Sequence, residues 1–430
     1  MNSALRIGIA GLGTVGAGVV KLLAEHGRLL ALRGGRPLKL VAVSARRKAK
    51  KRDIDLSGVR WENDPMALAT APDIDVVVEL IGGSGGVARR LVQKALSSGK
   101  HVVTANKALL AMHGTEIAMA AEKKGSILAF EAAVAGGIPI IKALREGLVG
   151  NRVRRLYGIL NGTCNYILTT MRETGRDFDV VLAEAQAAGY AEADPSFDVD
   201  GIDAAHKLAL LAALAFGGRP RFDAIHIEGI RHVSATDIAF ADQLGYRIKL
   251  LGVVRMTEQG LEQRLHPCMV PVAAPIAQVE GVFNAVVVEG DQVGAVMHEG
   301  RGAGAGPTAS AVVGDLIELA RGLELPTFGV PAAALHDHPI APMAAHAGSY
   351  YIRLMVLDQP GVLADISAVL RDHEVSIESL IQRGRNPGQA VPIVLTSHDT
   401  TEARMSGALA RIAALPAVIE PPRMIRIERS

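Results

Sequence analysis

Short, mainly apolar runs followed by glycine or polar residues recur through the first 130 positions of the chain. Leu5–Ala10 is such a run, and Asp75–Ile81 and His101–Lys107 repeat the pattern further along. Apolar runs of this length bounded by glycine are typical of strands that are buried on both faces. After the first run, Ala17–Ala24 has the apolar spacing of a helix. The pattern therefore predicts an α/β fold in which parallel strands alternate with helices.

The turn between the first strand and its helix carries three glycines, in the order Gly11-Leu-Gly13-Thr14-Val15-Gly16. Between a strand and a helix, this spacing predicts the dinucleotide-binding turn of a Rossmann-type domain. Gly11 would make the tight bend, Gly13 would let backbone amides approach the pyrophosphate, and Gly16 would allow close helix packing. Arg6 and the apolar residues after it superficially resemble a signal peptide, but a signal peptide does not explain the glycine spacing.

The end of the second predicted strand, Leu38–Ser44, bears on the choice between NAD(H) and NADP(H). A domain selective for NAD(H) offers an aspartate or glutamate to the adenosine ribose at this point. Here the strand is followed by a hydroxyl and two cations, from Ser44, Arg46 and Arg47. These groups suit a 2′-phosphate, so we expect NADP(H) to be preferred and NAD(H) to be accepted. The alternative is a solvated basic loop, because the positive charges continue to Arg52.

The middle of the chain contains a dense group of charges. Five carboxylates and one lysine lie between Gly189 and Lys207, directly before an apolar helical run. We expect Asp200 to cap this helix, and the four-residue offset places Asp203 and Lys207 on one helix face. A surface ion pair, a metal site and a polar ligand site all remain open. The spacing of an EF-hand loop is absent from the sequence, which argues against calcium.

The wider spacing around this group resembles the signature of homoserine dehydrogenases. The matching positions are Ala185, Gly189-Tyr190, Asp194-Pro195, Asp198, Gly201, Asp203 and Lys207. Members of that family interconvert aspartate semialdehyde and homoserine with NAD(P), in threonine, methionine and isoleucine biosynthesis. The segment Thr104-Ala-Asn106-Lys107 is also similar to the family, in which this lysine reaches the reacting carbonyl.

The resemblance implies a role for each polar residue of the group. Lys107 and Lys207 would face the aldehyde oxygen, and one of them would donate the final proton. Glu192 and Asp203 would hold the substrate ammonium group, and Asp198 would orient its neighbours. The amides of Gly162 and Thr163 would bind the substrate carboxylate, and Tyr190 would also contact the substrate. Asn106 would lie beside the nicotinamide.

Two glycine-containing segments extend the resemblance. In the family, a glutamate and nearby backbone carbonyls surround sodium or another monovalent cation, and the matching residues are Glu131, Val134, Gly136 and Ile138. Taken alone, these residues equally fit a plain Gly-Pro turn. The glycine-rich loop that contains Gly304 would lie against the cofactor, and an apolar helix at about 309–323 would return to the nucleotide-binding domain.

Cys164 departs from the family, whose members usually carry threonine or serine at this position. A thiol here opens a second enzymatic interpretation, a semialdehyde dehydrogenase in which the cysteine attacks the aldehyde. The local sequence contains no histidine to activate the thiol. We therefore expect Cys164 to be a small packing residue.

The pattern changes after a proline-rich segment at 326–348. Strands are expected at 350–356, 376–382, 390–396 and 424–428, with helices after the first and third, which gives a βαββαβ order. This order predicts a ferredoxin-like antiparallel sheet with helices on one face. It resembles an ACT domain, whose strand-turn-helix motif matches Asp358, Gly361, Val362 and Leu363 and whose expected effector is threonine.

Two other interpretations of the C-terminal segment agree less well with the sequence. An RNA-recognition module shares the topology, but it needs stacking aromatic residues that the central strands lack. A catalytically silent amino-acid sensor is disfavoured because Lys107, Lys207 and the cofactor glycines are all present.

Length and composition set the outer limits. The 430 residues predict two or three domains. A net charge of +2 and 3% aromatic residues give no sign of a nucleic-acid partner, and the apolar run after Lys207 is too short to span a membrane. Two cysteines fit a reducing cytoplasm. The expected domains are a nucleotide-binding domain at 1–130, a substrate-binding and dimerisation domain at 131–308, a linker at 326–348 and an ACT domain at 349–430, in a homodimer or homotetramer.

Overall fold

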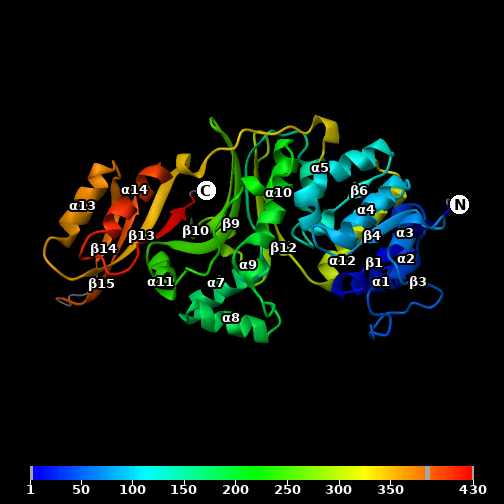
Figure 1. The fold of residues 1–430 in the computed structure, drawn as a ribbon, viewed down its shortest axis with the longest axis horizontal. Coiled ribbons are helices and arrows are strands. Elements are labelled where there is room, and N and C mark those ends of the chain that lie inside the picture. Colours follow the sequence, from blue (N-terminus) through cyan, green and yellow to red (C-terminus); the bar gives the residue numbers. More distant parts are fainter. Residues whose placement is uncertain (1–2, 383–387, 429–430) are drawn as a thin grey trace. The chain divides into compact units, whose positions relative to one another are not determined.

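The structure is a computed structural model that describes residues 3–382 and 388–428 (Figure 1). The chain divides into two compact units. Unit 1 comprises residues 1–162, 202–225 and 282–338, and unit 2 comprises residues 163–201, 226–281 and 339–430. Each unit is therefore assembled from segments that lie far apart in the sequence.

Unit 1 contains a six-stranded parallel sheet with the strand order β3-β2-β1-β4-β5-β6. Its strands are β1 (Leu5–Ala10), β2 (Leu38–Ser44), β3 (Arg60–Glu62), β4 (Val76–Glu79), β5 (His101–Thr104) and β6 (Leu128–Ala129). The winding direction reverses between β1 and β4, and doubly wound sheets bind ligands at the carboxyl ends of strands beside this reversal. The predicted Rossmann-type fold is confirmed.

Two groups of helices accompany this sheet. Helices α1 (Thr14–Glu25), α2 (Gly27–Gly34) and α12 (Ala305–Arg321) contact one another. In a second group, α4 (Gly86–Ser97) contacts both α3 (Met66–Thr70) and α5 (Lys107–Lys123). Val312 and Leu316 of α12 are fully buried in the same cluster as Ile7 and Ile9 of β1. Burying a side chain of this size stabilises the fold by roughly 1.5–3 kcal/mol. Hydrophobic burial thus holds a late segment of the chain against the first strand.

A second, antiparallel group of strands in unit 1 consists of β7 (Val153–Ile159), β11 (Phe283–Gly290) and β12 (Gly294–Arg301), with β11 in the middle. Helix α10 (Ile202–Phe216) contacts β7 and α5. Its residues from 203 to 213 are all buried, which explains why the sequence of this helix is apolar around its circumference. The start of α10 therefore lies in protein interior, where any charged side chain needs a partner.

The first part of unit 2 is built on a long hairpin of β9 (Tyr246–Thr257) and β10 (Gly260–Pro271), with the short β8 (His226–Ile227) parallel to β10. Its helices are α7 (Gly162–Thr174), α8 (Phe178–Ala187), α9 (Ser196–Val199) and α11 (Ala235–Gln243). Helix α11 begins with a reciprocal capping box between Ser234 and Asp237.

The C-terminal part of unit 2 confirms the predicted βαββαβ order. The sheet order is β17-β13-β15-β14, from β13 (Ala347–Leu357), β14 (Ile377–Gln382), β15 (Ala390–Ser397) and β17 (Arg423–Ile427). Alternate residues of β13, from Tyr350 to Val356, pack on α13 (Val362–Asp372) and α14 (Glu402–Ala413) in one cluster. Both helices therefore lie on one face of the sheet, as the order requires. A two-residue strand, β16 (Thr400–Thr401), pairs with the start of β13.

Buried ion pairs join this sheet to the hairpin of unit 2. Strand β17 runs parallel to β10, and Arg426 on β17 bonds to Glu228 at 2.9 and 3.1 Å and to Glu402. Arg264 on β10 bonds to Glu262 at 2.6 Å and to Glu428. Both guanidinium groups are almost fully buried. Each arginine has carboxylate partners, which a buried charge requires.

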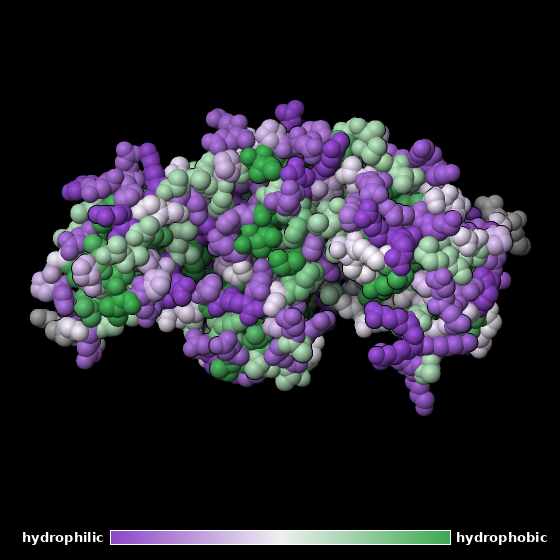
Figure 2. All heavy atoms as spheres, viewed as in Figure 1, coloured by the Kyte–Doolittle hydropathy of each residue, from purple (hydrophilic) through white to green (hydrophobic). Residues whose placement is uncertain are grey.

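The surface shows no large exclusively apolar area in the view drawn. Figure 2 shows hydrophilic residues over most of the visible face, with smaller groups of apolar residues between them. Within residues 3–382 and 388–428, no helix combines the length and the apolar character needed to cross a bilayer.

Three details differ from the sequence predictions. Helix α10 begins at Ile202 after Gly201, whose φ is 87°, and the carboxylate of Asp200 pairs with Arg231 at 2.5 Å. Asp200 as N-cap was therefore wrong, because a distant arginine takes its carboxylate. Helix α12 begins at Ala305, before the expected 309. The predicted linker is partly packed: Phe328 is 1% exposed and its ring lies 5.5 Å from that of Phe130.

The remaining elements are single turns. They are η1 (Glu131–Ala133), α6 (Ile140–Lys142), η2 (Ala143–Gly147), η3 (Phe222–Ala224), η4 (Pro275–Gln278), η5 (Ala332–Ala334) and η6 (Met343–Ala345).

Candidate active site

Two lysines and one aspartate meet where α5 and α10 begin in unit 1. Lys107 is the first residue of α5, and Asp203 and Lys207 are one turn apart on α10. The Nζ atom of Lys207 lies 2.7 Å from Oδ2 of Asp203, and the Nζ atom of Lys107 lies 3.1 Å from Oδ1. One carboxylate therefore bridges two ammonium groups that are 100 residues apart in the sequence.

Backbone and amide groups at the end of β7 complete this arrangement. The carbonyl oxygen of Leu160 accepts a hydrogen bond from Lys207 at 2.7 Å, and Nδ2 of Asn161 donates to Asp203 at 2.9 Å. Sequence reasoning missed Asn161 as a partner of the site, although it stands directly before Gly162 in the motif. Two of the three N–H donors of Lys207 are thereby fixed in direction.

The charge of Asp203 is stabilised although the residue is buried. Burial by itself raises the pKa of Asp203, but the charges of Lys207 and Lys107 outweigh it, with further hydrogen bonds from Lys207 and Asn161. The net result is a pKa below the ordinary value, so the carboxylate is ionised at neutral pH. Lys207 is nearly as buried as Asp203, whereas the side chain of Lys107 is 29% exposed. Such a cluster presents cationic donors to an oxygen that gains negative charge.

His206 is a second residue that the sequence did not single out. It is 7% exposed and its ring stacks on that of Phe222 with centroids 4.4 Å apart. Burial, followed by the charge of Lys107, lowers the pKa of His206, while Asp203 acts in the opposite sense. His206 is therefore neutral at pH 7 and adds no further positive charge beside the lysines.

The glycine turn after β1 has the geometry of a cofactor cradle. Gly11 has a φ of 104°, and a Cβ atom there would lie 2.4 Å from the carbonyl oxygen of Leu80. A Cβ at Gly16 would lie 2.0 Å from the oxygen of Gly11, whereas one at Gly13 reaches no described atom within 4 Å. Gly11 and Gly16 are thus required by packing, while Gly13 faces open space. Thr14 and Val15 form the first turn of α1.

The basic loop after β2 is tied to this turn. Nε of Arg52 donates to the carbonyl of Leu12 at 3.0 Å, and its Nη2 donates to the carbonyl of Arg47 at 2.9 Å. Ser44 is buried, and its carbonyl accepts from the amide of Gly11 at 2.8 Å. The side chains of Arg46 and Arg47 are exposed beside it. The sequence did not identify Arg52 as the residue that orders this loop.

Asn106 and Gly304 hold the starts of two helices. The side chain of Asn106 caps α5 by accepting from the amide of Leu109 at 3.1 Å and donates to the carbonyl of Gly83 at 2.8 Å. Gly304 is the exposed N-cap of α12 with a φ of 118°. Asn106 thereby fixes the position from which Lys107 projects.

The segment around Glu131 is buried and sharply bent. Ala135 and Gly136 both have positive φ values, 53° and 50°. Glu131 accepts from the amides of Ile141 and Lys142 at 2.9 and 3.0 Å. Burial, reinforced by the charge of Asp315, raises the pKa of Glu131 to about 7. The carbonyls predicted to bind a cation are those of Val134, Gly136 and Ile138. The carbonyl of Ile138 also accepts a hydrogen bond from the amide of Ile140 at 2.8 Å.

Of the other predicted substrate residues, all except Gly162 belong to unit 2. The ring of Tyr190 lies 4.7 Å from that of Tyr166, and its carbonyl accepts from Oγ1 of Thr163 at 2.9 Å. Glu192 is exposed, and its carbonyl accepts from the side chain of Gln186 at 3.0 Å. Asp198 lies on α9. Gly162 ends the first segment of unit 1.

Cys164 is fully buried, and its Sγ lies 3.2 Å from the carbonyl oxygen of Asp198, to which it donates. The thiol therefore packs on the buried side of α7 and does not face solvent. The geometry favours the packing role over the nucleophilic one, because a reactive thiolate needs an accessible, electropositive environment.

The turn of the C-terminal module contains the residues predicted to bind an effector. Gly361 is the N-cap of α13 with a φ of 95°, and Val362 is buried in the core of the module. Backbone bonds connect Asp358 to Gln389 and Gly388 at 2.9 and 3.1 Å. Leu363 is half-buried.

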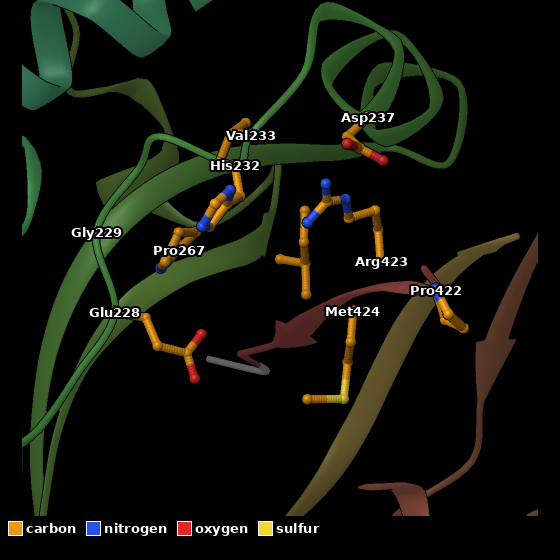
Figure 3. Close-up of a pocket in the computed structure, with 10 residues that line it drawn as sticks. Glu228, Gly229, His232, Val233, Asp237, Pro267, Pro422, Arg423 and Met424 are labelled. Carbon is orange, nitrogen blue, oxygen red and sulfur yellow. The ribbon is translucent and has the colours of Figure 1, made fainter. Parts of the chain in front are cut away.

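A separate cavity of about 380 Å³ lies in unit 2 between the 228–237 segment, β10 and β17 (Figure 3). Arg423 extends toward Asp237, and Glu228 and Met424 line the opposite part (Figure 3). The carboxylate of Asp237 is already bound by Arg353 at 2.7 and 3.2 Å and by the hydroxyl of Tyr351 at 3.0 Å. This cavity belongs to unit 2, whereas Lys107, Asp203 and Lys207 belong to unit 1.

Comparisons with known proteins agree on one family. The family model described as homoserine dehydrogenase matches residues 139–317, that of the homoserine dehydrogenase NAD-binding domain matches 11–131, and that of the ACT domain matches 350–417. The chain is 49% identical to the homoserine dehydrogenase of Pseudomonas aeruginosa, with 99% of both chains covered.

Solved structures give the same result. The crystal structure of a homoserine dehydrogenase from Thiobacillus denitrificans has a TM-score of 0.94 and 47% identity, covering 99% of this chain and 98% of that chain. A hyperthermophilic archaeal homoserine dehydrogenase in complex with NADPH has a TM-score of 0.63 and 28% identity, covering 76% of this chain and 99% of that chain.

Replacing Gly13 or Gly16 with alanine should have two different effects, one on cofactor binding and the other on the packing of the turn. We expect Gly16→Ala to lower the Tm of the free protein, because its Cβ would meet the backbone oxygen of Gly11. Gly13→Ala should leave that Tm unchanged and weaken NADPH binding by about tenfold or more, because its Cβ would intrude where the sequence predicts that the pyrophosphate approaches. Thermal unfolding and NADPH titration measure the two effects. Equal losses of Tm in both variants would contradict this division of roles.

Proposed function

The chain belongs to the homoserine dehydrogenase family, and we propose that Lys107 and Lys207, bridged by Asp203, perform the proton transfer of its reaction. The enzyme is an oxidoreductase of amino-acid biosynthesis that acts on the CH–OH group of homoserine. The contact of both ammonium groups with one carboxylate is the observation that carries the proposal. We further propose that its product serves threonine, methionine and isoleucine synthesis.

In the reductive direction, the two ammonium groups act on the aldehyde oxygen of aspartate semialdehyde. NADPH, when bound, supplies the hydride for the aldehyde carbon. Negative charge then develops on the oxygen, where Lys107 and Lys207 stabilise it and one of them donates its proton. Hydrogen bonds to Asp203 and to the carbonyl of Leu160 fix the orientation of the Lys207 ammonium group, so this donor needs little reorganisation during the reaction.

The bridging role changes the expectation for Asp203. Both of its oxygens bond to lysine, which supports a role in holding the two donors. We therefore assign the substrate ammonium group to Glu192, and this assignment, like those of Tyr190, Asp198, Gly162 and Thr163, remains a prediction. A homodimer or homotetramer also remains a prediction.

We propose that the enzyme prefers NADP(H) over NAD(H). The exposed Arg46 and Arg47 follow β2, and Arg52 ties their loop to the glycine turn. A 2′-phosphate at this position would gain charge-assisted hydrogen bonds that NAD(H) does not offer.

We propose a monovalent cation such as sodium beside Glu131. The residues fit such an ion, because a buried carboxylate with a raised pKa is stabilised by a positive charge and the bent segment offers backbone oxygens. Val134, Gly136 and Ile138 would supply these oxygens. The role of the cation would be to order the segment that leads into α6.

We propose threonine as the effector of the ACT domain. The support is the family match at 350–417 and the position of Gly361 at the turn before α13. Threonine would regulate the enzyme by binding one of two conformational states more tightly.

Replacing Lys107 or Lys207 with methionine tests the proposed chemistry. Each substitution keeps an apolar stem but removes a donor from the aldehyde oxygen, so turnover should fall about 100- to 1000-fold while NADPH binding survives. Lys100→Met is the matched control, because Lys100 is as buried as Lys207 and donates to the backbone carbonyls of Ala71 and Ile74. Near-normal turnover in both active-site variants, measured by NADPH absorbance, would rule out the chemistry.

The coenzyme preference is measured by the kcat/KM values for NADPH and NADH. We expect NADPH to be favoured at least about tenfold, and Arg46→Ala or Arg47→Ala to reduce this preference by lowering the value for NADPH alone. Arg28→Ala, at an exposed arginine of α2, is the control. A clear preference of the wild-type enzyme for NADH would refute the assignment.

The cation proposal predicts a specific effect of sodium on stability. At pH 8, sodium chloride should raise the Tm above its value in choline chloride of equal ionic strength, because choline is too large for the site. Glu131→Gln should remove this difference by removing the negative charge that attracts the ion. An equal sodium effect in wild type and variant would show that the ion binds elsewhere.

A further inference from the structure

We propose that Asn284 is a positioning residue for the reaction, whose carboxamide connects the segment bound to Lys207 and Asp203 with the loop before α12. The two hydrogen-bonding atoms of this carboxamide would find partners only in the ligand-bound enzyme. The inference rests on the proposed function, because it concerns the placement of the same lysines.

Asn284 is the second residue of β11, the central strand of the antiparallel group in unit 1. It is paired with Gly300 on β12, and its neighbour Ala285 is paired with Ile159, the last residue of β7. The side chain therefore lies where both neighbouring strands end. On one side the chain continues as 160–162, and on the other as 301–304.

The carboxamide of Asn284 is buried without satisfying its hydrogen-bonding capacity. The residue is 1% exposed, and neither Nδ2 nor Oδ1 has a hydrogen-bond partner within residues 3–382 and 388–428. Leaving a buried polar atom without a partner is unfavourable, and most buried amides are bonded. An apolar side chain of this size would avoid that cost, so we infer that the amide gains its partners when the neighbouring segments move on ligand binding.

Two glycines pack directly against this carboxamide. A Cβ atom at Gly302 would lie 2.2 Å from Cγ and from Nδ2 of Asn284, and one at Gly162 would lie 3.4 Å from Oδ1. The face of the amide thus contacts the backbone of Gly302, and its oxygen lies beside Gly162. Gly302 in turn approaches Gly136, where a Cβ would lie 2.3 Å from the Gly302 oxygen. The amide is therefore in contact with both segments at the points where each has no side chain.

Both segments lead directly to functional groups. In 160–162, the carbonyl of Leu160 holds Lys207 and the side chain of Asn161 holds Asp203. In 301–304, Gly302 is buried, Ala303 and Gly304 are exposed, and α12 begins one residue later. A small movement of either segment on ligand binding would bring backbone donors and acceptors to Nδ2 and Oδ1. New bonds there would fix the lysines and the loop together.

Asn284→Leu tests this role in the full-length enzyme. It replaces the amide by an apolar group of similar size, so the Tm of the free enzyme should stay the same or rise. The KM values for homoserine and NADP+ should increase about ten- to a hundredfold, with a smaller fall in kcat, since bonds formed on binding are lost. The rise in Tm caused by homoserine with NADP+ should also be smaller than in wild type.

Asn165→Leu is the matched control. Asn165 is equally buried, but its amide is satisfied by the carbonyl of Val279 at 3.1 Å and by Lys249 at 3.2 Å. This variant should lose Tm in the free state and keep its KM values once folded. Asn284→Ala adds no atoms and replaces Asn284→Leu if leucine does not fit.

Two results would overturn the proposal. One is that Asn284→Leu or Asn284→Ala keeps wild-type KM values and ligand-induced stabilisation. The other is that both variants lose Tm or fail to fold, as expected for an amide that is satisfied in the free enzyme by a bound water. Turnover of Lys107→Met and Lys207→Met in the same assay separates this outcome from failure of the proposed lysine chemistry.

Discussion

The carboxylate of Asp203 between two ammonium groups is the interaction on which the rest of the site depends. Two ammonium groups about 4 Å apart repel each other by about 4 kcal/mol at an effective dielectric constant of ~20. A carboxylate that contacts both adds two attractions that offset this repulsion, and here it does so at 2.7 and 3.1 Å. Without it, a buried and a half-buried ammonium group would face each other with no negative charge between them. The same negative charge leaves the pair with a single net positive charge to offer the substrate oxygen.

The surrounding fold serves to bring these three side chains together. Strand β5 of the parallel sheet ends shortly before Asn106. Asn106 caps α5 and thereby fixes the position of Lys107. The apolar circumference of α10 buries Asp203 and Lys207, and the end of β7 supplies their remaining partners. Helix α5 contributes Lys107, helix α10 contributes Asp203 and Lys207, and the residues after β7 contribute their hydrogen-bond partners, so no single element forms the site. This explains why the site lies at strand and helix ends, where backbone groups are available for side chains.

Much of this architecture was predictable because it leaves a local pattern. Mainly apolar runs such as Val76–Glu79 predicted the parallel strands, and Asp203 and Lys207 could be placed on one face by their offset. The partners that come from distant segments were not predictable. Asp200 was expected to cap α10, but Arg231, which lies 31 residues later, takes its carboxylate. Asn161 and Arg52 likewise bond to residues 42 and 40 positions away, Asp203 and Leu12. The spacing of apolar residues in the sequence does not predict such contacts.

The most direct test of this account is the pH dependence of homoserine oxidation in Asp203→Asn. The substitution keeps the shape of the side chain and removes the charge between the lysines. Oxidation requires one neutral amine, so the pH of half-maximal rate should move down by about one unit or more, because two uncompensated ammonium groups favour loss of a proton. A half-maximal pH that stays at the wild-type value, or moves up, would contradict the claim that Asp203 holds both charges.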